Sequence, residues 1–387
     1  MLSHFFKKVN TRVLAIALAG FSAFLNLYAT QSLLPLFSQV FHASKVEVSL
    51  TVSATTIAVG LAAPLVGILA DVVGRKYVIC SAIGGLSIPT FLTATALDLN
   101  ALIGWRFAQG LFIAVIFSVT IAYISEEWAD VGVGSAMSAY ITGNIVGGVL
   151  GRFLSGVVAD YFSWRLAFII LGCLNLVCVF FVLVWLPRSR HFVCQKNIIT
   201  SVRAFGMHLR NRRLLAAYAV GFNVLFANVS TFTYVNFYLA APPFHLGTTA
   251  LGAIFFVYLI GAVVTPIVGK WLDSIGYRLV LAVAIATAGL GVLITLVPKL
   301  WLVIIGLALG SSGIFVCQSA AKSYVGVVAK EGRSSASGLY VCCFYMGGSV
   351  GAILPGFVWS LGGWSACVEL IVFVQLLTGG IALAYWR

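Results

Sequence analysis

Long apolar segments recur along the whole chain and restrict its possible folds more than any other feature. A transmembrane helix needs about 20 mostly apolar residues. With 61% hydrophobic and 9% charged residues, the chain also has too few polar side chains to cover a water-soluble domain. We therefore predict an all-α membrane protein with twelve transmembrane helices, at roughly residues 12–37, 48–70, 77–97, 101–124, 134–158, 164–186, 214–240, 250–271, 279–297, 300–320, 335–360 and 364–386.

A short motif divides the chain into two similar halves. The segment 64–76 carries Pro, Gly, Asp and Gly at intervals of three, four and three residues, and 266–278 repeats them 202 positions later. Such a repeat indicates two related structural units. Between them lies the longest hydrophilic stretch. We predict an N-terminal six-helix bundle over 1–186, a cytoplasmic linker over 187–213 and a C-terminal six-helix bundle over 214–387.

The positive charges are distributed by loop rather than gathered in one patch. With the N-terminus inside, the outer loops hold only Lys45, Arg165 and Lys299, and the other loop cations fall on the cytoplasmic side. This asymmetry follows the positive-inside rule. It predicts a multi-pass protein of a bacterial inner membrane with both termini in the cytoplasm. The membrane topology then explains the net charge of +13. We expect the lipid bilayer, not nucleic acid, as the partner.

The sequence shows no constellation that indicates catalysis. It has no G-x-x-x-x-G-K-[ST] loop, so direct use of ATP is not predicted. It also lacks a nucleophile elbow and a His/Asp metal cluster, and its eight cysteines form no C-x-x-C pair. We predict a protein that is not an enzyme and that binds neither a cofactor nor a metal.

Several segments resemble motifs of the major facilitator superfamily, and the resemblance extends over essentially the whole chain. Residues 67–76 (GILADVVGRK) resemble the signature loop after helix 2, and 106–110 (RFAQG) resemble the helix 4 motif. Residues 143–148 (GNIVGG) are similar to the helix 5 motif of the antiporters, and 160–165 (DYFSWR) to the turn into helix 6. The likeness is closest to the YnfM-like group of bacterial inner-membrane permeases, described as arabinose or drug exporters.

This resemblance implies two pseudo-symmetric six-helix bundles around a central cavity, with transport by alternating access. The expected function is secondary active transport of a small organic solute, with export coupled to protons favoured over import. An importer, symporter or uniporter of an anionic metabolite is the alternative, and a non-transporting receptor or scaffold is an alternative of another class. The resemblance favours a monomer.

The resemblance also implies a gating latch at the cytoplasmic face. Asp71 is expected near the start of helix 11, and Arg75 is expected to pair with Glu126 or Glu127; both contacts would lock the outward-open state. The alternative is that these charges only fix the topology. Because Tyr277 replaces the first Arg in the second copy, we expect function from the first copy alone, with candidate residues Gly67, Asp71, Gly74, Arg75, Lys76, Glu126 and Glu127.

Two arginines lie inside predicted spans, where a charged side chain needs an interior partner. Arg106 shares a helix face with Gln109. It is a candidate for substrate binding or proton coupling, or a structural arginine bonded to helix 1. Arg152 lies on one stripe with Asn144 and Gly148, and it is either available to an anionic substrate or directed to the outer interface.

Glycines and polar residues complete the set of candidates. Gly143, Gly147 and Gly151 form a stripe that predicts close packing of another helix. Glu369 is the only carboxylate well within a predicted span, so the buried charges favour an anionic or zwitterionic solute. Residues of helices 1 and 7 are candidates for substrate contacts, with hydrogen bonds between helices as the alternative role: Asn26, Tyr28, Gln31, Asn223, Asn228, Ser230 and Tyr234.

Overall fold

The computed structural model describes residues 2–69, 74–128, 132–189, 206–264, 276–329 and 333–386, and within these ranges it contains helices and connecting turns but no strand. The chain before the linker forms α1 (Leu2–Leu27), η1 (Gln31–Leu33), α2 (Leu34–Val40), α3 (Lys45–Leu69), α4 (Arg75–Ala94), α5 (Leu99–Glu127), α6 (Val133–Tyr161) and α7 (Trp164–Trp185). The chain after it forms α9 (Arg212–Ala240), α10 (Thr248–Ala253), η2 (Ile254–Phe256), α12 (Tyr277–Ile294), α13 (Leu300–Val328) and α14 (Arg333–Tyr385).

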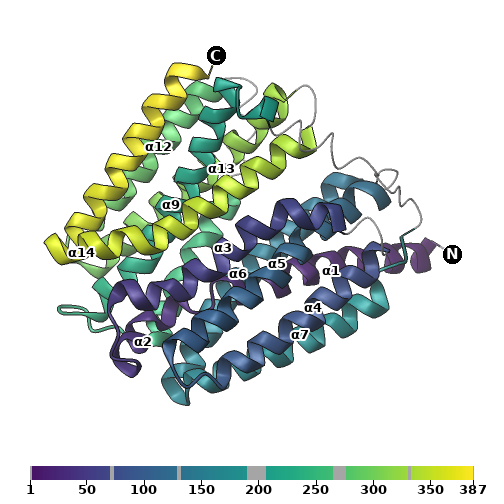
Figure 1. Ribbon diagram of the computed structural model, residues 1–387, viewed down its shortest axis with the longest axis horizontal. Helices are drawn as coiled ribbons and strands as arrows, with labels where there is room; N and C mark the ends of the chain where they lie inside the picture. The colour runs from purple at the N-terminus through teal and green to yellow at the C-terminus, as the bar shows by residue number, and fades with distance from the viewer. Residues whose placement is uncertain are drawn as a thin grey trace.

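The helices form two bundles, which we call the N bundle (α1 to α7) and the C bundle (α9 to α14). Figure 1 shows them converging at the end where α2 and the bend of α14 lie, and diverging toward the end that carries both termini. We call the end with the termini the proximal end and the opposite one the distal end. Among the described residues, the hydrogen bonds and ring contacts that join the bundles lie in the distal half and the middle.

Each of the twelve predicted spans falls on an apolar helix in its described part, and residues 70 and 265–271, at the ends of the second and eighth predicted spans, lie outside the described residues. Ten described helices are long and apolar enough to cross a membrane, and Thr248–Val264 is a shorter one. The last of the ten holds two predicted spans, because α14 bends sharply at Gly362 and Gly363. Gly363 has a φ of +62°, a left-handed conformation that suits glycine. A bilayer favours helical spans of this kind, since a helix satisfies all its backbone polar groups internally.

The first span is not one continuous helix, in contrast to the prediction. It breaks after Leu27, passes through the 3₁₀ turn η1 and resumes as α2 with Pro35 in its first turn. In an uninterrupted helix the N–H of residue 35 would bond to the carbonyl of Gln31, but proline has no N–H. The carbonyl of Gln31 instead accepts a hydrogen bond from Asn236 Nδ2 of the C bundle, at 2.9 Å.

Small residues bring α1 and α6 into close contact, as the glycine stripe predicts. A Cβ atom added at Gly143, Gly147 or Gly151 would lie 2.0–2.3 Å from a carbonyl oxygen of α1. The C bundle repeats this arrangement: a Cβ at Gly347 or Gly351 of α14 would lie 2.0–2.5 Å from a carbonyl oxygen of α9. Each bundle therefore contains a helix–helix seam that requires glycine at these positions.

Candidate functional site

Arg152 occupies the boundary between the two bundles, in the distal half of α6, and is 3% exposed. Its Nε donates to Oε1 of Gln31 at 2.7 Å, and its Nη1 donates to the carbonyl of Gly148 at 2.7 Å. The guanidinium carbon lies 4.6 Å from the ring centroid of Tyr28, 4.4 Å from Phe255 and 5.4 Å from Tyr258. We call Tyr28, Gln31, Arg152, Phe255 and Tyr258 the Arg152 site.

The Arg152 site stabilises a cation without neutralising it. Amide and carbonyl oxygens supply dipoles, and aromatic faces attract a guanidinium through their quadrupole. None of the partners of Arg152 among the described residues is a carboxylate. Transfer of a charge out of water carries a large desolvation cost, and dipoles and ring faces lower this cost without cancelling the net charge. An anion entering between the bundles would therefore find an uncompensated positive charge.

Both bundles contribute to this site through irregular helix segments. Gln31 belongs to η1 of the N bundle, and Phe255 belongs to η2 of the C bundle. Short 3₁₀ segments within longer helices often mark hinges. The side chain of Gln31 also donates to Thr233 Oγ1 of α9, at 3.2 Å. One amide thus links the arginine of one bundle to a helix of the other.

Arg106 differs from Arg152 because its guanidinium is held within the N bundle. The side chain is 0% exposed. Its Nε donates to the carbonyl of Thr51 at 3.1 Å, and its Nη atoms donate to the carbonyls of Asn26 at 2.7 Å and Leu27 at 2.5 Å. It also bonds to Oε1 of Gln109. These contacts tie α5 to α3 and to the end of α1, so Arg106 holds the break in the first span in place.

A polar network extends from this cluster through the interior of the N bundle. Gln109 Nε2 donates to Thr90 Oγ1 at 3.1 Å, and Thr90 Oγ1 donates to Asn26 Oδ1 at 3.2 Å. Asn26 Nδ2 in turn donates to Asn175 Oδ1 at 3.0 Å. Asn26 and Gln109 are both 0% exposed, and the partners named here for their side chains all belong to the N bundle.

At the proximal end, Arg75 and Glu126 form a bidentate ion pair within the N bundle. Nε and Nη2 of Arg75 each donate to one carboxylate oxygen of Glu126, at 2.5 Å. Gly74 precedes α4 and Glu127 ends α5, so these motif residues gather at one corner with Lys76. Gly67 belongs to α3. The ion pair joins α4 to α5. Asp71, the other residue of the predicted latch, lies outside the described residues.

The other candidates fall in separate places. Tyr258 donates to Asn228 Oδ1 at 2.9 Å, which places Asn228 beside the Arg152 site. Ser230 and Tyr234 donate to the carbonyls of Gly351 and Ala352, at 3.0 and 2.7 Å, and so bind α9 to α14 inside the C bundle.

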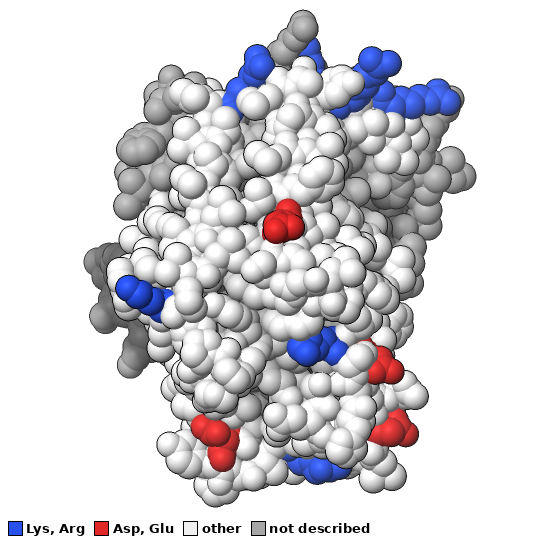
Figure 2. Space-filling view, turned by 90° about the vertical axis from the view of Figure 1, so that its left-hand side faces the viewer, with Lys and Arg blue, Asp and Glu red and all other residues white. Residues whose placement is uncertain are grey.

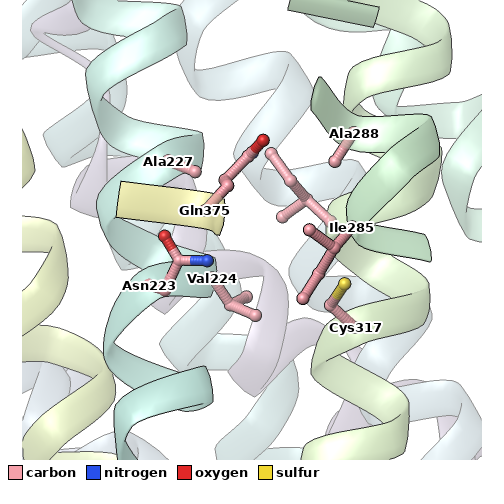
Figure 3. Close-up of a pocket in the computed structure, with 8 residues that line it drawn as sticks. Asn223, Val224, Ala227, Ile285, Ala288, Cys317 and Gln375 are labelled. Atoms are coloured by element: carbon pink, nitrogen blue, oxygen red, sulfur yellow. The ribbon is translucent and has the colours of Figure 1, made fainter. Parts of the chain in front are cut away.

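Three further candidates do not contact the Arg152 site. Asn144 lies on the α1–α6 seam, where its Nδ2, in the amide orientation that satisfies its neighbours, is 3.2 Å from the carbonyl of Gly20. Asn223 lines a cavity of about 10 Å³ with Gln375, between α9 and α14 (Figure 3). Glu369 is exposed on the outer face of α14.

Sequence reasoning missed the part of the site that the C bundle supplies. Phe255 and Tyr258 are aromatic residues in an apolar helix, and nothing in the sequence distinguishes them from aromatics that face lipid. The charge pattern places Lys322 among the loop cations of the cytoplasmic side, yet this lysine belongs to α13 and its Nζ lies 6.0 Å from the ring centroid of Phe344. The adjacent Tyr345 stacks on Phe117 of the N bundle at 6.1 Å, so this lysine stands close to the boundary between the bundles.

Comparisons with known proteins agree with the motifs and the fold. A family model described as Major Facilitator Superfamily matches residues 16–262 and 232–387. The chain is 32% identical to the inner membrane transport protein YnfM of Escherichia coli, over 95% of this chain and 89% of that protein. It is 33% identical to the uncharacterized MFS-type transporter YybF of Bacillus subtilis, over 93% and 89% respectively.

Solved transporter structures show the same fold. A mutant of the nucleoside transporter NupG superposes with a TM-score of 0.76 at 17% identity, covering 97% of this chain and 100% of that one. A bacterial homolog of the human lysosomal transporter Spinster, in an inward-facing and occupied conformation, gives 0.75 at 15% identity, covering 96% and 94%. The chain therefore belongs to the major facilitator superfamily and is a multi-pass membrane transporter.

Proposed function

We propose that the protein is a secondary active transporter of a small organic anion or zwitterion, and that Arg152 binds the negative group of the substrate. The observation that carries this proposal is the position of Arg152: buried between the two bundles, with no carboxylate partner among the described residues. Lys322 places a second cation close to the same boundary. A cationic solute would meet repulsion from both.

Alternating access gives the site a role in both conformations. In the present arrangement the distal halves of the bundles are in contact, and Phe255 and Tyr258 cover the guanidinium. Opening the distal side would withdraw these rings and expose Arg152 to water from that side. A bound anion stabilises the closed site by supplying the missing charge, and this differential interaction is what a ligand needs to shift a conformational equilibrium.

We further propose that the proximal end is cytoplasmic, so that this conformation faces the cytoplasm of a bacterial cell. The distribution of Lys and Arg supports this orientation. The proposed direction is export coupled to protons, supported by the resemblance of residues 143–148 to the helix 5 motif of antiporters. A relative named multi-drug resistance efflux pump PmrA, from Streptococcus pneumoniae, is 26% identical over 40% of this chain. Import or facilitated passage of an anionic metabolite is the alternative.

Transport in proteoliposomes tests the proposal. The solutes are a carboxylate, its neutral amide and an ammonium compound on the same carbon skeleton, each followed with and without an imposed pH gradient. We expect movement of the carboxylate only, and loss of this movement in Arg152→Gln. Arg165→Gln is the matched control. Arg165 is also a distal arginine, but its guanidinium stacks on Trp164 and donates to the carbonyl of Ala96, both in the N bundle.

The outcomes separate the alternatives. Movement of the ammonium compound alone would contradict an anionic substrate. Carboxylate movement that ignores the pH gradient would favour the uniporter. No movement of any solute by well-folded protein would favour a receptor or scaffold.

A further inference from the structure

A long groove runs along the outer face of the C bundle, between α12 and the second part of α14. Its volume is about 510 Å³, within the range of sites for drug-sized ligands. Apolar side chains line it from Leu281 to Leu293 on α12 and from Val372 to Leu383 on α14. Leu290 and Leu376 are 60% and 67% exposed, so the groove opens toward the bilayer and not toward the N bundle.

The groove exists because the two helices are joined at both ends but carry small residues between. At the distal end Trp364 Nε1 donates to Thr295 Oγ1 at 3.0 Å, and at the proximal end Arg278 Nη2 donates to the carbonyl of Leu383 at 2.6 Å. Between these anchors, Gly289 and Gly380 leave space where other residues would place side chains. The stretch of α12 along the groove, from Leu281 to Leu293, spans about 18 Å at 1.5 Å per residue.

An unpaired acceptor lies at the base of the groove. Gln375 is 2% exposed, and its Oε1 has no hydrogen bond in the described structure. The residue lines both the groove and the small cavity that it shares with Asn223 (Figure 3). A buried amide oxygen without a donor is destabilising. A ligand with an N–H or O–H group would satisfy it.

A carboxylate stands at the distal end of the same groove. Glu369 lies two helical turns from Leu376 on one face of α14, and five residues from Trp364, about 8 Å along the axis. It is exposed and has no partner among the described residues. Figure 2 shows the side of the molecule that carries α12 and α14 in Figure 1, and most of this surface is neither acidic nor basic. An acid at membrane depth favours a cationic partner.

We propose that this groove binds a cationic amphiphile from the bilayer. The ammonium group pairs with Glu369, the apolar body lies between α12 and α14, and a donor on that body bonds to Gln375 Oε1. The acyl chain of an ordinary phospholipid fills the groove less well, because it leaves both acceptors unpaired. The site is separate from the Arg152 site and opposite to it in charge preference, so it does not depend on the proposed substrate.

Binding to the full-length protein in nanodiscs tests the proposal. The probe is a dansylated alkyl diamine, whose sulfonamide supplies an N–H donor and whose free end is an ammonium; its twin ends in a carboxylate. Fluorescence is corrected for partition into empty nanodiscs. We expect saturable binding of the ammonium probe and none of its twin. Glu369→Gln should weaken the binding by about tenfold or more, because the membrane ion pair is lost.

Two further variants locate the ligand in the groove. Gly380→Leu should abolish binding without disturbing the fold, because a Cβ at Gly380 meets no atom within 4 Å and the side chain enters the groove. Gly104→Leu is the matched control, since a Cβ at Gly104 on α5 also meets no atom within 4 Å. Gln375→Leu should weaken binding while raising the thermal stability of the free protein.

Three results would overturn the proposal: equal binding of the carboxylate twin, full binding by Glu369→Gln, or full binding by Gly380→Leu. Each would show that the probe only partitions into lipid or binds elsewhere. None of them bears on anion transport through the Arg152 site, which is measured separately in proteoliposomes.

Discussion

Gln31 and Thr233 are hydrogen-bonded to each other, and they are 202 positions apart, the interval that separates the two copies of the loop motif. Positions related by this interval can touch only near the axis that relates the two bundles. The pair therefore marks the axis, and the same glutamine side chain accepts from Arg152 at 2.7 Å. One amide side chain therefore contacts both the arginine of the N bundle and a helix of the C bundle.

Thr233→Val tests whether this bond stabilises distal closure. Valine keeps the shape of threonine but cannot accept from Gln31 Nε2. A neutral hydrogen bond contributes about 0.5–1.5 kcal/mol, so we expect a shift of about two- to tenfold toward the distal-open form. The readout is maleimide labelling of a cysteine at Ala29, which is 1% exposed here, in a background without native cysteines.

Thr231→Val is the control for that experiment. Thr231 lies on the same helix and is buried, but its Oγ1 has no hydrogen bond in the described structure. Its replacement should leave labelling unchanged. Equal labelling of the two variants would mean that the Gln31–Thr233 bond does not hold the distal side.

Arg106→Lys should destabilise the protein more than Arg152→Lys does. Lysine keeps the charge but cannot reproduce the planar fork that reaches the carbonyls of Thr51, Asn26 and Leu27. Each carbonyl left without a donor costs about 1–3 kcal/mol. Thermal unfolding in detergent measures the difference. If Arg106→Lys keeps both full stability and full transport, Arg106 has only a topological role.

The Arg75–Glu126 pair should show a favourable coupling energy in a double-mutant cycle of Arg75→Gln and Glu126→Gln. The side chains are 6% and 25% exposed, and hydrogen bonds to charged groups contribute about 1.5–3 kcal/mol, reduced by screening at the exposed carboxylate. Additive effects in thermal unfolding would contradict the expectation. If the pair also supports gating, Arg75→Gln should raise the reactivity of cysteines at the proximal mouth, whereas Lys76→Gln should not.

Gly147→Ala should destabilise the N bundle by about 1–3 kcal/mol, because the added methyl group overlaps backbone that cannot easily move. Its Cβ would lie 2.3 Å from the carbonyl oxygen of Phe21. Gly134→Ala, in the same helix, meets no atom within 4 Å and should be neutral or slightly stabilising. Chemical denaturation of the two variants in detergent gives the comparison.

The spans and the glycine seam could be predicted from sequence because local patterns determine them. Lipid requires helices of a certain length, and Gly143, Gly147 and Gly151 can serve only where another backbone approaches. The direction in which the side chain of Glu369 points could not be predicted in this way. Its helix is apolar on every side, so its sequence does not distinguish the lipid face from the bundle interior.

The sequence predicted the N-bundle residues of the Arg152 site as candidates but not those of the C bundle. A charged residue inside a span made Arg152 a candidate, whereas Tyr28 and Gln31 were candidates for substrate contacts as polar residues of helix 1 and not as partners of Arg152. Phe255 and Tyr258 could not be identified, because their contact with the guanidinium arises only when the C bundle closes against α1 and α6. The break of the first span had a sequence signal in Pro35, which a search for apolar length alone does not detect.

Because Pro35 has no N–H, the carbonyl of Gln31 lacks the α-helical donor that an uninterrupted span would supply. The bond from Asn236 to Gln31 O can therefore break without unwinding a single turn of helix in either bundle. Water can hydrate the released carbonyl as soon as the distal side parts. Separation of the bundles at this point then requires only rotation of the Asn236 side chain and hydration of the carbonyl. The helices themselves can move as rigid rods. Replacing Pro35 with alanine would offer the carbonyl of Gln31 an N–H donor from its own chain in competition with Asn236, whose Nδ2 would keep its bond to the carbonyl of Phe232.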